Sequence, residues 1–502
     1  MSEPIEIVIV GGGTAGWMCA AGLVSLVKAN ICRVTLIESE EIASVGVGEA
    51  TLPHMKEFND HIGINEVDMM QKTNATFKLG IEFVDWGFLG ASYIHPFGAF
   101  GEKIGGSDFH QQWARAQQNG GNGSIEEFSY AIEACRKNRF EFPVENHSEI
   151  NSTYSYAYHF DASLYAKFLR NFAEAQGLTR VEGKIVDVNL HPDSGFINSV
   201  ILESGKTISG DYFIDCSGFR SLLLSKTLKT PFEDWSQWLV CDRAFAVPSE
   251  RVAELTPYTR STAKSAGWQW RIPLQHRTGN GYVFSSQFIS EDEAAHSLLS
   301  NLDAPALAEP KLLKFKAGRY KHSWQKNCIA IGLASGFLEP LESTSIYLIQ
   351  VAIINLTRLF PNKKPNSALS DEFNRLIDME YDRVRDFLIL HYHLNTRDDS
   401  ELWRYCRSMP VPETLMQKIN VFKHRGHIDI YRFGLFAPPS WISVFLGQGL
   451  RQENIDPYAY NLSLEQVQKK LRDLSSSINE RVQIMPTHDE FIADYCPSKR
   501  LS

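Results

Sequence analysis

The feature that most constrains the fold of this chain is a glycine-rich turn close to its N-terminus. The run IEIVIV at 5–10 predicts a buried strand, and the mostly apolar stretch 18–30 predicts a helix. Between them, GGGTAGW places Gly11, Gly13 and Gly16 in the G-x-G-x-x-G spacing. Glycines there let the backbone approach a pyrophosphate and meet it with helix N-terminal N–H groups. The sequence therefore predicts a dinucleotide-binding unit.

A second hydrophobic run, 33–37, ends in Glu38, which is placed to accept hydrogen bonds from a ribose. The alternative interpretation of the glycine run is an ordinary strand–helix turn without a ligand, and the presence of Glu38 argues against it. Two more predicted strands break at Gly218 and Gly332. Three such turns, far apart in sequence, suit one flavin held across a single sheet. No second G-x-G-x-x-G follows a predicted strand, so a flavin here must be reduced from elsewhere.

Bulk composition excludes several classes of protein. A length of 502 residues predicts two or three coupled modules, and 43% hydrophobic with 22% charged residues is typical of a globular protein. A net charge of -9 argues against a nucleic-acid partner, and no apolar run approaches the roughly 20 residues that cross a membrane. The eight scattered cysteines show no C-x-x-C and no ligand spacing with histidine, which predicts reduced thiols, a cytoplasmic location and no metal site. The first predicted strand begins too early for a signal peptide.

The rest of the chain is expected to alternate between helices, strands and loops. We expect helices at 54–90, 157–175, 346–360 and through most of 371–502, long loops at 101–152, a strand pair at 183–188 and 197–202, and antiparallel strands at 235–290.

Several motifs together resemble the flavin-dependent tryptophan halogenase family, over the chain to about residue 450. The W-x-W-x-I-P element is more specific than the glycine fingerprint. The matching stretches are GGGTAGW at 11–17, VGEATLP at 47–53, FKLGIEF at 77–83, WQWRIP at 268–273 and GLASGFLEPLESTSIY at 332–347.

The resemblance implies an α/β fold with two parts. An FAD-binding, Rossmann-like box domain of the flavin-monooxygenase type would span 1–370, with substrate-site insertions at about 84–155. A docked, mainly helical domain, 371–502, would pack over the substrate site. The implied cofactor-binding residues are Gly11, Gly13, Thr14, Ala15, Gly16, Glu38, Ala50, Gly332 and Phe337.

The same resemblance implies the chemistry. FADH2 from a separate NAD(P)H-dependent flavin reductase, O2 and a halide (chloride or bromide) would give hypohalous acid at the flavin. A tunnel would carry the acid to Lys78, for electrophilic halogenation of an indole or another electron-rich aromatic. A homodimer is an expectation at the level of the family, and neither nucleic acid nor membrane is an expected partner.

Lys78 matches the family lysine that hydrogen-bonds hypohalous acid or forms a haloamine. The residues around it predict partial desolvation and a lowered pKa, against the alternative of a surface lysine. Glu342 matches the family carboxylate that orients the electrophile and stabilises or deprotonates the cationic ring intermediate, although an acid before an apolar helix could also cap that helix. Ser343 matches a residue that lies between the flavin site and the substrate site. Thr344 and Ser345 would bind halide through backbone N–H groups.

Two departures from the family bear on specificity. Ser345 replaces the usual glycine, so a need for positive φ or close halide approach there would narrow the site and alter the halide preference. The paired tyrosines that embrace tryptophan are absent from the corresponding stretch, PSWISVFLG at 439–447, so we expect a member that is not specific for free tryptophan.

The implied substrate pocket contains His95, Phe97, Trp441 and Phe445. For His95 the alternative is an ordinary core histidine.

The implied wall between flavin and substrate contains Trp268, Trp270 and Pro273, where the alternative is a plain core strand. Such a wall argues against the rival function, a flavin-dependent aromatic monooxygenase that hydroxylates its substrate. A non-catalytic flavin-binding protein is a second rival, which Lys78 and Glu342 together disfavour.

Overall fold

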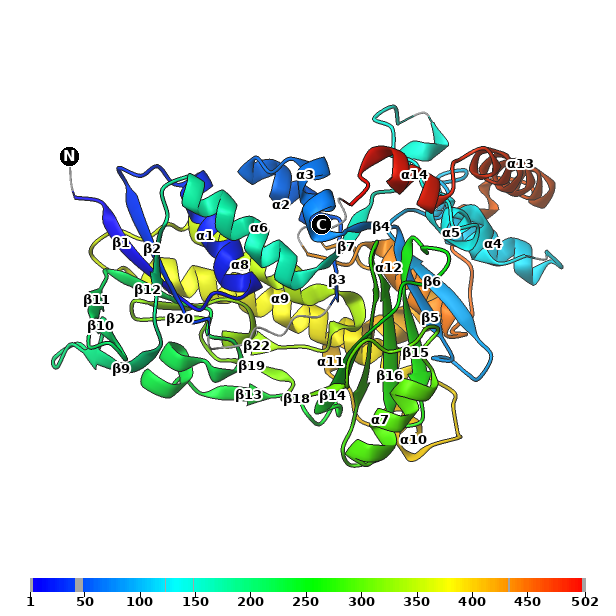
Figure 1. Ribbon diagram of the computed structural model, residues 1–502. Coiled ribbons are helices and arrows are strands. Elements are labelled where there is room, and N and C mark those ends of the chain that lie inside the picture. Colours follow the sequence, from blue (N-terminus) through cyan, green and yellow to red (C-terminus); the bar gives the residue numbers. More distant parts are fainter. Residues whose placement is uncertain (1–2, 41–47, 122, 148, 432–433, 499–502) are drawn as a thin grey trace.

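The computed structural model describes residues 3–40, 48–121, 123–147, 149–431 and 434–498. Its N-terminal part is built on a six-stranded sheet of order β20-β21-β12-β1-β2-β8 (Figure 1). Every neighbouring pair in this sheet is parallel except β20 with β21. The strands are β1 (Ile5–Val10), β2 (Cys32–Glu38), β8 (Thr179–Glu182), β12 (Tyr212–Asp215), β20 (Trp324–Gln325) and β21 (Cys328–Ala330).

The three strands that lead into glycine turns are neighbours in this sheet. Val10 of β1 is in register with Asp215 of β12, and Asp215 with Ala330 of β21. Because the three strands run parallel, the turns that follow them meet at the carboxyl edge of the sheet, where ligands bind in open α/β folds. The prediction that these distant turns belong to one sheet is confirmed.

The two faces of β1 are covered differently, as the alternation of its side chains requires. Ile7 and Ile9 join the large core that includes α1 (Thr14–Leu26) and α8 (Thr344–Arg358). Val8 and Val10 pack in a second cluster with Val200 of a three-stranded sheet. That sheet contains β9 (Ile185–Leu190), β10 (Ile197–Leu202) and β11 (Thr207–Ser209).

A seven-stranded sheet of order β18-β14-β17-β16-β15-β5-β6 forms the other half of the box (Figure 1). Only β15 and β5 pair in parallel, so the antiparallel strands expected at 235–290 are confirmed. Its strands are β5 (Gly80–Val84), β6 (Ser92–Pro96), β14 (Arg243–Ser249), β15 (Tyr258–Lys264), β16 (Gly267–Pro273), β17 (Thr278–Phe284) and β18 (Lys311–Lys314), with α7 (Glu291–Ser300) after β17. Smaller sheets contain β3 (Gly48–Ala50), β7 (Ala157–Asp161) and β4 (Thr76–Lys78), and β13 (Phe232–Asp234), β19 (Gly318–Tyr320) and β22 (Gly336–Phe337).

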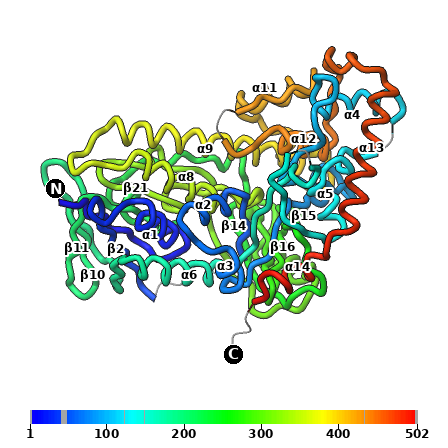
Figure 2. Tube along the Cα trace, turned by 90° about the horizontal axis from the view of Figure 1, so that it is seen from above, coloured from blue at the N-terminus to red at the C-terminus, as the bar shows by residue number. Residues whose placement is uncertain are grey.

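The C-terminal part is helical, as expected. In Figure 2, α11, α12 and α13 gather with α4 and α5 at the end of the molecule away from β1. No helix among the described residues is long and apolar enough to cross a membrane. The helices are α9 (Ser367–His393), α10 (Glu401–Ser408), α11 (Glu413–Arg425), α12 (Pro438–Gly447), α13 (Leu464–Gln483) and α14 (His488–Tyr495).

The helical expectation for 54–90 is wrong beyond residue 73. Helices α2 (His54–Ile62) and α3 (Glu66–Thr73) are present, and Asn74 then ends α3 in the left-handed conformation. The following residues form β4 and β5. All residues of 75–83 are buried, so this stretch has no polar helical face and fits strands covered on both sides.

Two further expectations need correction. The stretch 101–152 is not a set of long loops, because it contains α4 (Phe109–Gln118), η1 (Ile125–Phe128), α5 (Tyr130–Arg136) and η2 (Ile150–Ser152). A capping box between Ser124 and Glu127 starts η1 there. In 157–175 the chain first forms β7, and α6 (Ala162–Ala175) follows it. Asp161 is the N-cap residue of α6, and its side chain accepts hydrogen bonds from the N–H groups of Ser163 and Leu164.

Gly80 permits the close approach of β5 to β6, which carries His95. A Cβ at Gly80 would lie 2.6 Å from the carbonyl oxygen of His95. We therefore expect Gly80→Ala to lower the free energy of unfolding by about 1–3 kcal/mol, measured by urea denaturation. Gly48→Ala is the matched control, because the atom nearest to its Cβ position lies 3.5 Å away. We expect it to lower the free energy of unfolding by less than Gly80→Ala does. Equal losses in the two variants would contradict this reading of Gly80.

Candidate functional site

A cavity of about 1030 Å³ opens at the carboxyl edge of the parallel sheet. Gly16 packs against the glycine turn itself: a Cβ on it would come within 1.9 Å of the carbonyl oxygen of Gly11. The other predicted cofactor-binding residues line the cavity: Gly11, Gly13, Thr14, Ala15, Glu38, Ala50, Gly332 and Phe337.

The glycines of the first turn fit a dinucleotide cofactor. Gly11 has φ +114°, and a Cβ would lie 2.3 Å from the carbonyl oxygen of Cys216, so the turn packs tightly on β12. Gly13 is the N-cap residue of α1, and a Cβ built on it meets no atom within 4 Å. No side chain caps the start of α1, which leaves its first N–H groups facing the cavity for an anion such as a pyrophosphate.

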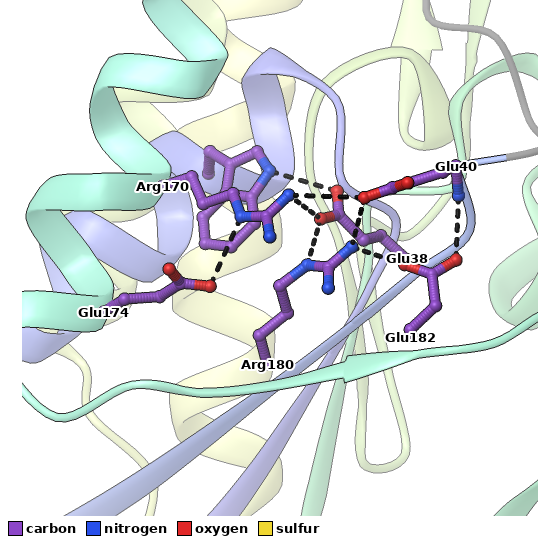
Figure 3. A network of polar contacts seen from close by, with 7 residues as sticks. Glu38, Glu40, Arg170, Glu174, Arg180 and Glu182 are labelled. Carbon is purple, nitrogen blue, oxygen red and sulfur yellow. Dashed lines mark hydrogen bonds and ion pairs between the residues drawn. The ribbon is translucent and has the colours of Figure 1, made fainter.

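Glu38, at the end of β2, is fixed by side chains on both of its oxygens (Figure 3). Oε1 accepts a hydrogen bond from Arg180 Nε at 2.5 Å and lies 3.5 Å from Arg170 Nη1. Oε2 accepts one from Trp17 Nε1 at 3.2 Å. Because each carboxylate oxygen can accept two hydrogen bonds, Glu38 keeps capacity for a ribose hydroxyl. Glu40, Glu174 and Glu182 complete the ionic network around the two arginines.

Lys78 ends β4 and is completely buried. Its Nζ donates to the Oγ of Ser343 at 2.8 Å and to the carbonyl oxygen of Thr51 at 3.0 Å, and it lies 5.0 Å from the centre of the Phe97 ring. Burial lowers the pKa of Lys78 to about 7, against the opposing effect of Glu342. The alternative of a surface lysine is therefore wrong.

Glu342 is also completely buried and lies at the end of η6 (Pro340–Glu342). Its Oε2 lies 2.8 Å from His95 Nδ1, and its Oε1 lies 2.8 Å from His391 Nε2 at an angle outside normal hydrogen-bond geometry. Burial alone would raise the pKa of Glu342, but the two histidines outweigh it and hold the pKa at about 2. The carboxylate therefore points to the histidines and does not cap α8, whose N-cap residue is Ser343.

Ser343 links the cavity to Lys78. Its backbone is left-handed, with φ 59° and ψ 31°, and its side chain lines the cavity while accepting the hydrogen bond from Lys78. Thr344 and Ser345 form the first turn of α8, and Ser345 also lines the cavity. The positive φ thus belongs to Ser343, and Ser345 needs no glycine on conformational grounds.

The predicted wall lies on β16. Trp268 and Trp270 line the cavity, and the indole N–H of Trp268 donates to Glu339 Oε2 at 3.0 Å. Pro273 ends the strand, outside the described lining of the cavity, and its carbonyl oxygen accepts from Thr76 Oγ1 at 2.7 Å.

Aromatic side chains gather beside Lys78 and Glu342. The ring of His95 lies 6.5 Å from Phe97 and 5.8 Å from Phe387, measured between ring centres. Phe387 also contacts Trp441, at 5.0 Å. The structure thus brings three of the four predicted pocket residues into one cluster: His95 and Trp441 contact Phe387, and Phe97 contacts His95. The fourth, Phe445, lies behind Trp441, stacked on Phe422 of α11.

Sequence reasoning missed His391, Phe387 and Phe436. Phe436 precedes α12 and stacks on Phe387 at 3.8 Å. A signal for His391 was present, since it sits in the helical run FLILHYHL and every residue of 386–392 is buried. A histidine in such surroundings needs a polar partner.

Comparison with known proteins agrees with this geometry. A family model described as tryptophan halogenase matches residues 6–463, a range that includes every predicted site residue. The tryptophan 6-halogenase ThaL of Streptomyces albogriseolus is 35% identical over 89% of this chain and 90% of its own. The tryptophan 7-halogenase KtzQ of Kutzneria sp. (strain 744) is 38% identical over 83% and 81%. The structure of BrvH, a flavin-dependent halogenase from Brevundimonas sp. BAL3, matches with TM-score 0.95 and 42% identity over 99% of this chain and 100% of its own.

The buried amine of Lys78 predicts a specific dependence of stability on pH. Between about pH 7 and the pKa of about 10.4 for an unfolded lysine, the unfolded chain binds a proton that the folded chain lacks. This contribution makes the folded state more stable as pH rises through that window. We therefore expect the wild type to gain stability relative to Lys78→Met between pH 7 and pH 10, in urea denaturation at several pH values. Lys56→Met, which removes a partly exposed lysine of α2 that pairs with Asp60, is the control. Parallel curves for wild type and Lys78→Met would contradict the assignment.

Proposed function

Because the chain belongs to the tryptophan halogenase family and is a flavin-dependent halogenase, we propose that it halogenates an indole or another electron-rich aromatic with hypohalous acid delivered to Lys78. One observation carries the proposal. Lys78 is completely buried and donates to Ser343, which itself lines the cavity that fits the cofactor. An electrophile leaving that cavity past Ser343 would meet the amine first.

The cavity fits FAD, with Gly11, Gly13 and Thr14 at the diphosphate and Glu38 at the ribose. Bound FADH2, with O2, supplies the oxidising power that converts chloride or bromide into hypohalous acid. A separate NAD(P)H-dependent flavin reductase is the proposed source of FADH2. The eight buried cysteines carry no disulfide, which supports the cytoplasm as the proposed compartment.

Halide binding is proposed at the start of α8. Ser345 lines the cavity there, and Thr344 is completely buried, with an Oγ1 that has no hydrogen-bond partner in the described part of the chain. Helix N–H groups at this position favour an anion next to the site where it is oxidised. The Cβ of Ser345, where the family has glycine, would restrict the size of that anion.

Lys78 and Glu342 have complementary tasks in the proposed reaction. With a pKa of about 7, Lys78 can donate a hydrogen bond to hypohalous acid as an ammonium or receive the halogen as a neutral amine. The ring carbon then forms its bond to halogen with π electrons of the ring as the bond from halogen to oxygen or nitrogen breaks. The ring C–H proton passes to Glu342. A carboxylate with a pKa of about 2 is a weak base, but the cationic ring is a far stronger acid.

The substrate would bind in the aromatic cluster of His95, Phe97, Phe387 and Trp441. A flat ring fits such surroundings through stacking and edge contacts. The mainly helical region 371–502 is proposed as the domain that covers this site. The relatives ThaL and KtzQ are described as acting on tryptophan, whereas the paired tyrosines are missing from this chain, so we propose an indole without a required amino-acid arm.

Gly13 provides a test of the cofactor site. Its Cβ position is open space in the cavity, so Gly13→Val should leave the thermal stability of the FAD-free protein nearly unchanged while weakening FAD binding at least about tenfold. Flavin fluorescence titration measures the affinity. Gly12→Ala is the contrasting variant, because its Cβ would lie 1.7 Å from Glu38 Oε2 and should reduce both stability and affinity. Unchanged FAD affinity in Gly13→Val would contradict the proposed diphosphate site.

The proposed reaction is tested by mass spectrometry of indole incubated with the protein, FAD, a flavin reductase, NADH, O2 and either chloride or bromide. We expect a halogenated product from the wild type and none from Lys78→Met. We expect at least about a hundredfold less from Glu342→Gln, which removes the base but keeps the shape. Lys56→Met, a surface control, should match the wild type.

FAD affinity should stay unchanged in all of these variants. Halogenated product from Lys78→Met would refute the role of the amine. An oxygenated product without halogen would favour the rival monooxygenase.

A further inference from the structure

The turn that carries Glu342 holds a second buried carboxylate, which the proposed reaction does not use. Glu339, three residues earlier, is completely buried. Its Oε2 accepts hydrogen bonds from Trp268 Nε1 at 3.0 Å and from the hydroxyl of Tyr392 at 2.5 Å, while Oε1 has no hydrogen-bond partner among the described residues. Within the described part of the chain, no cationic side chain forms an ion pair with Glu339.

The two donors come from two different elements of the fold. Trp268 belongs to β16 and lines the cavity. Tyr392 belongs to α9 and directly follows His391, whose Nε2 lies 2.8 Å from Glu342 Oε1. One carboxylate therefore joins the cavity wall to the helix that orients the second carboxylate.

The surroundings make these hydrogen bonds costly to lose. The ring of Tyr392 stacks on Trp403 at 5.7 Å and makes a T-shaped contact with Trp86 at 5.3 Å. Apart from Glu339, the one hydrogen-bond partner of its hydroxyl within the described residues is the thiol of Cys241, at 3.5 Å. A thiol is a weak hydrogen-bond partner. Burial raises the pKa of Glu339 to about 7 even though both donors oppose the rise, which agrees with its enclosed position.

We propose that Glu339 is a positioning residue that fixes Trp268 in the cavity wall and, through Tyr392, holds His391 against Glu342. Hypohalous acid then leaves the cavity past Ser343 and Lys78, and not through a gap at the wall. The inference rests on the proposed function. It differs from a purely structural role, because loss of Glu339 would uncouple oxidation of the flavin from halogenation of the substrate.

The experiment uses the FAD-loaded protein with a flavin reductase, indole and bromide. Two quantities are measured: the halogenated product formed per FADH2 oxidised, and the hypohalous acid that escapes to solvent, trapped by monochlorodimedone. The variants are Glu339→Leu, Glu339→Gln, Trp268→Phe and Tyr392→Phe. Tyr405→Phe is the matched control for Tyr392→Phe, because the hydroxyl of Tyr405 donates to the carbonyl oxygen of Gln237 at the surface.

We expect Glu339→Leu to lower the product per FADH2 at least about tenfold, with more trapped oxidant and with FAD affinity within about twofold of the wild type. Glu339→Gln keeps an acceptor for both donors and should retain most of the coupling. The product per FADH2 of Tyr392→Phe and of Trp268→Phe should lie between the values for Glu339→Leu and Glu339→Gln, while Tyr405→Phe should match the wild type. Full coupling in Glu339→Leu would overturn the proposal.

A double-mutant cycle separates positioning from independent effects. If Glu339 acts through Trp268, the double variant Glu339→Leu/Trp268→Phe should be no worse coupled than Glu339→Leu alone. Losses that multiply would overturn the proposal. If Glu339→Leu does not fold, Glu339→Gln and Tyr392→Phe still test the proposal. The assigned contacts would be contradicted if Tyr392→Phe kept its full product yield per FADH2 while Glu339→Gln lost it.

Crystal structures give a readout that does not depend on activity. We expect Glu339→Leu to shift the side chain of Trp268, which loses its acceptor, relative to the wild type. If that variant does not fold, we expect Tyr392→Phe to shift the side chain of the neighbouring His391. Unmoved side chains would overturn the inference. A wild type that makes no halogenated product would instead contradict the proposed function, and the crystal structures would still decide the role of Glu339.

Discussion

The site depends on keeping one lysine out of water. An ammonium has three N–H donors, and burying it without partners costs several kcal/mol. Lys78 finds two oxygen acceptors, on Ser343 and Thr51, and the face of Phe97 for its remaining side. This set satisfies the charged form only in part, so the neutral amine is populated near pH 7. An amine that exchanges readily between both forms can donate a proton to an electrophile or react with it, and the rest of the site is arranged to maintain that balance.

The chain meets this constraint by changing sheets at the lysine. Lys78 is the last residue of β4, and after Leu79 the chain enters β5 of another sheet at Gly80. The side chain therefore projects between two sheets toward the start of α8. Ser343 meets it there in a left-handed conformation, which is uncommon for a residue with a Cβ and costs of order 1 kcal/mol. The hydrogen bond to Lys78 gives a physical reason for retaining that strain, because an ordinary helical N-cap would turn Oγ toward the N–H groups of α8.

Sequence alone predicted what depends on local pattern. The strand and glycines at 5–16 specified the cofactor turn, and the small residues after β12 and β21 indicated that those strands end beside it. The burial of Lys78 did not follow from its neighbours alone, which favour a surface lysine; the resemblance of FKLGIEF at 77–83 to the family is what predicted it. The stretch 77–83 was assigned to a helix, because a run buried on every side carries no periodicity that distinguishes helix from strand. His391 was missed for a related reason: its importance comes from Glu342, 49 residues away in sequence, and no spacing rule connects a helix interior to a turn in another element.

Two glutamates on one short turn illustrate how environment, and not residue type, divides the work of a site. Glu342 faces two histidines and stays ionised, with a pKa of about 2, whereas Glu339 faces an indole N–H and a phenol and has a pKa of about 7. Both are fully buried, so desolvation raises both pKa values, and the coulombic and hydrogen-bond effects of the two histidines lower that of Glu342 below its usual range. A carboxylate held by neutral donors gains little from ionisation, and its contribution is geometric. Because only Pro340 and Leu341 separate the two groups along the chain, a displacement of Glu339 would move Glu342 as well as Trp268, which Glu339 holds by a hydrogen bond.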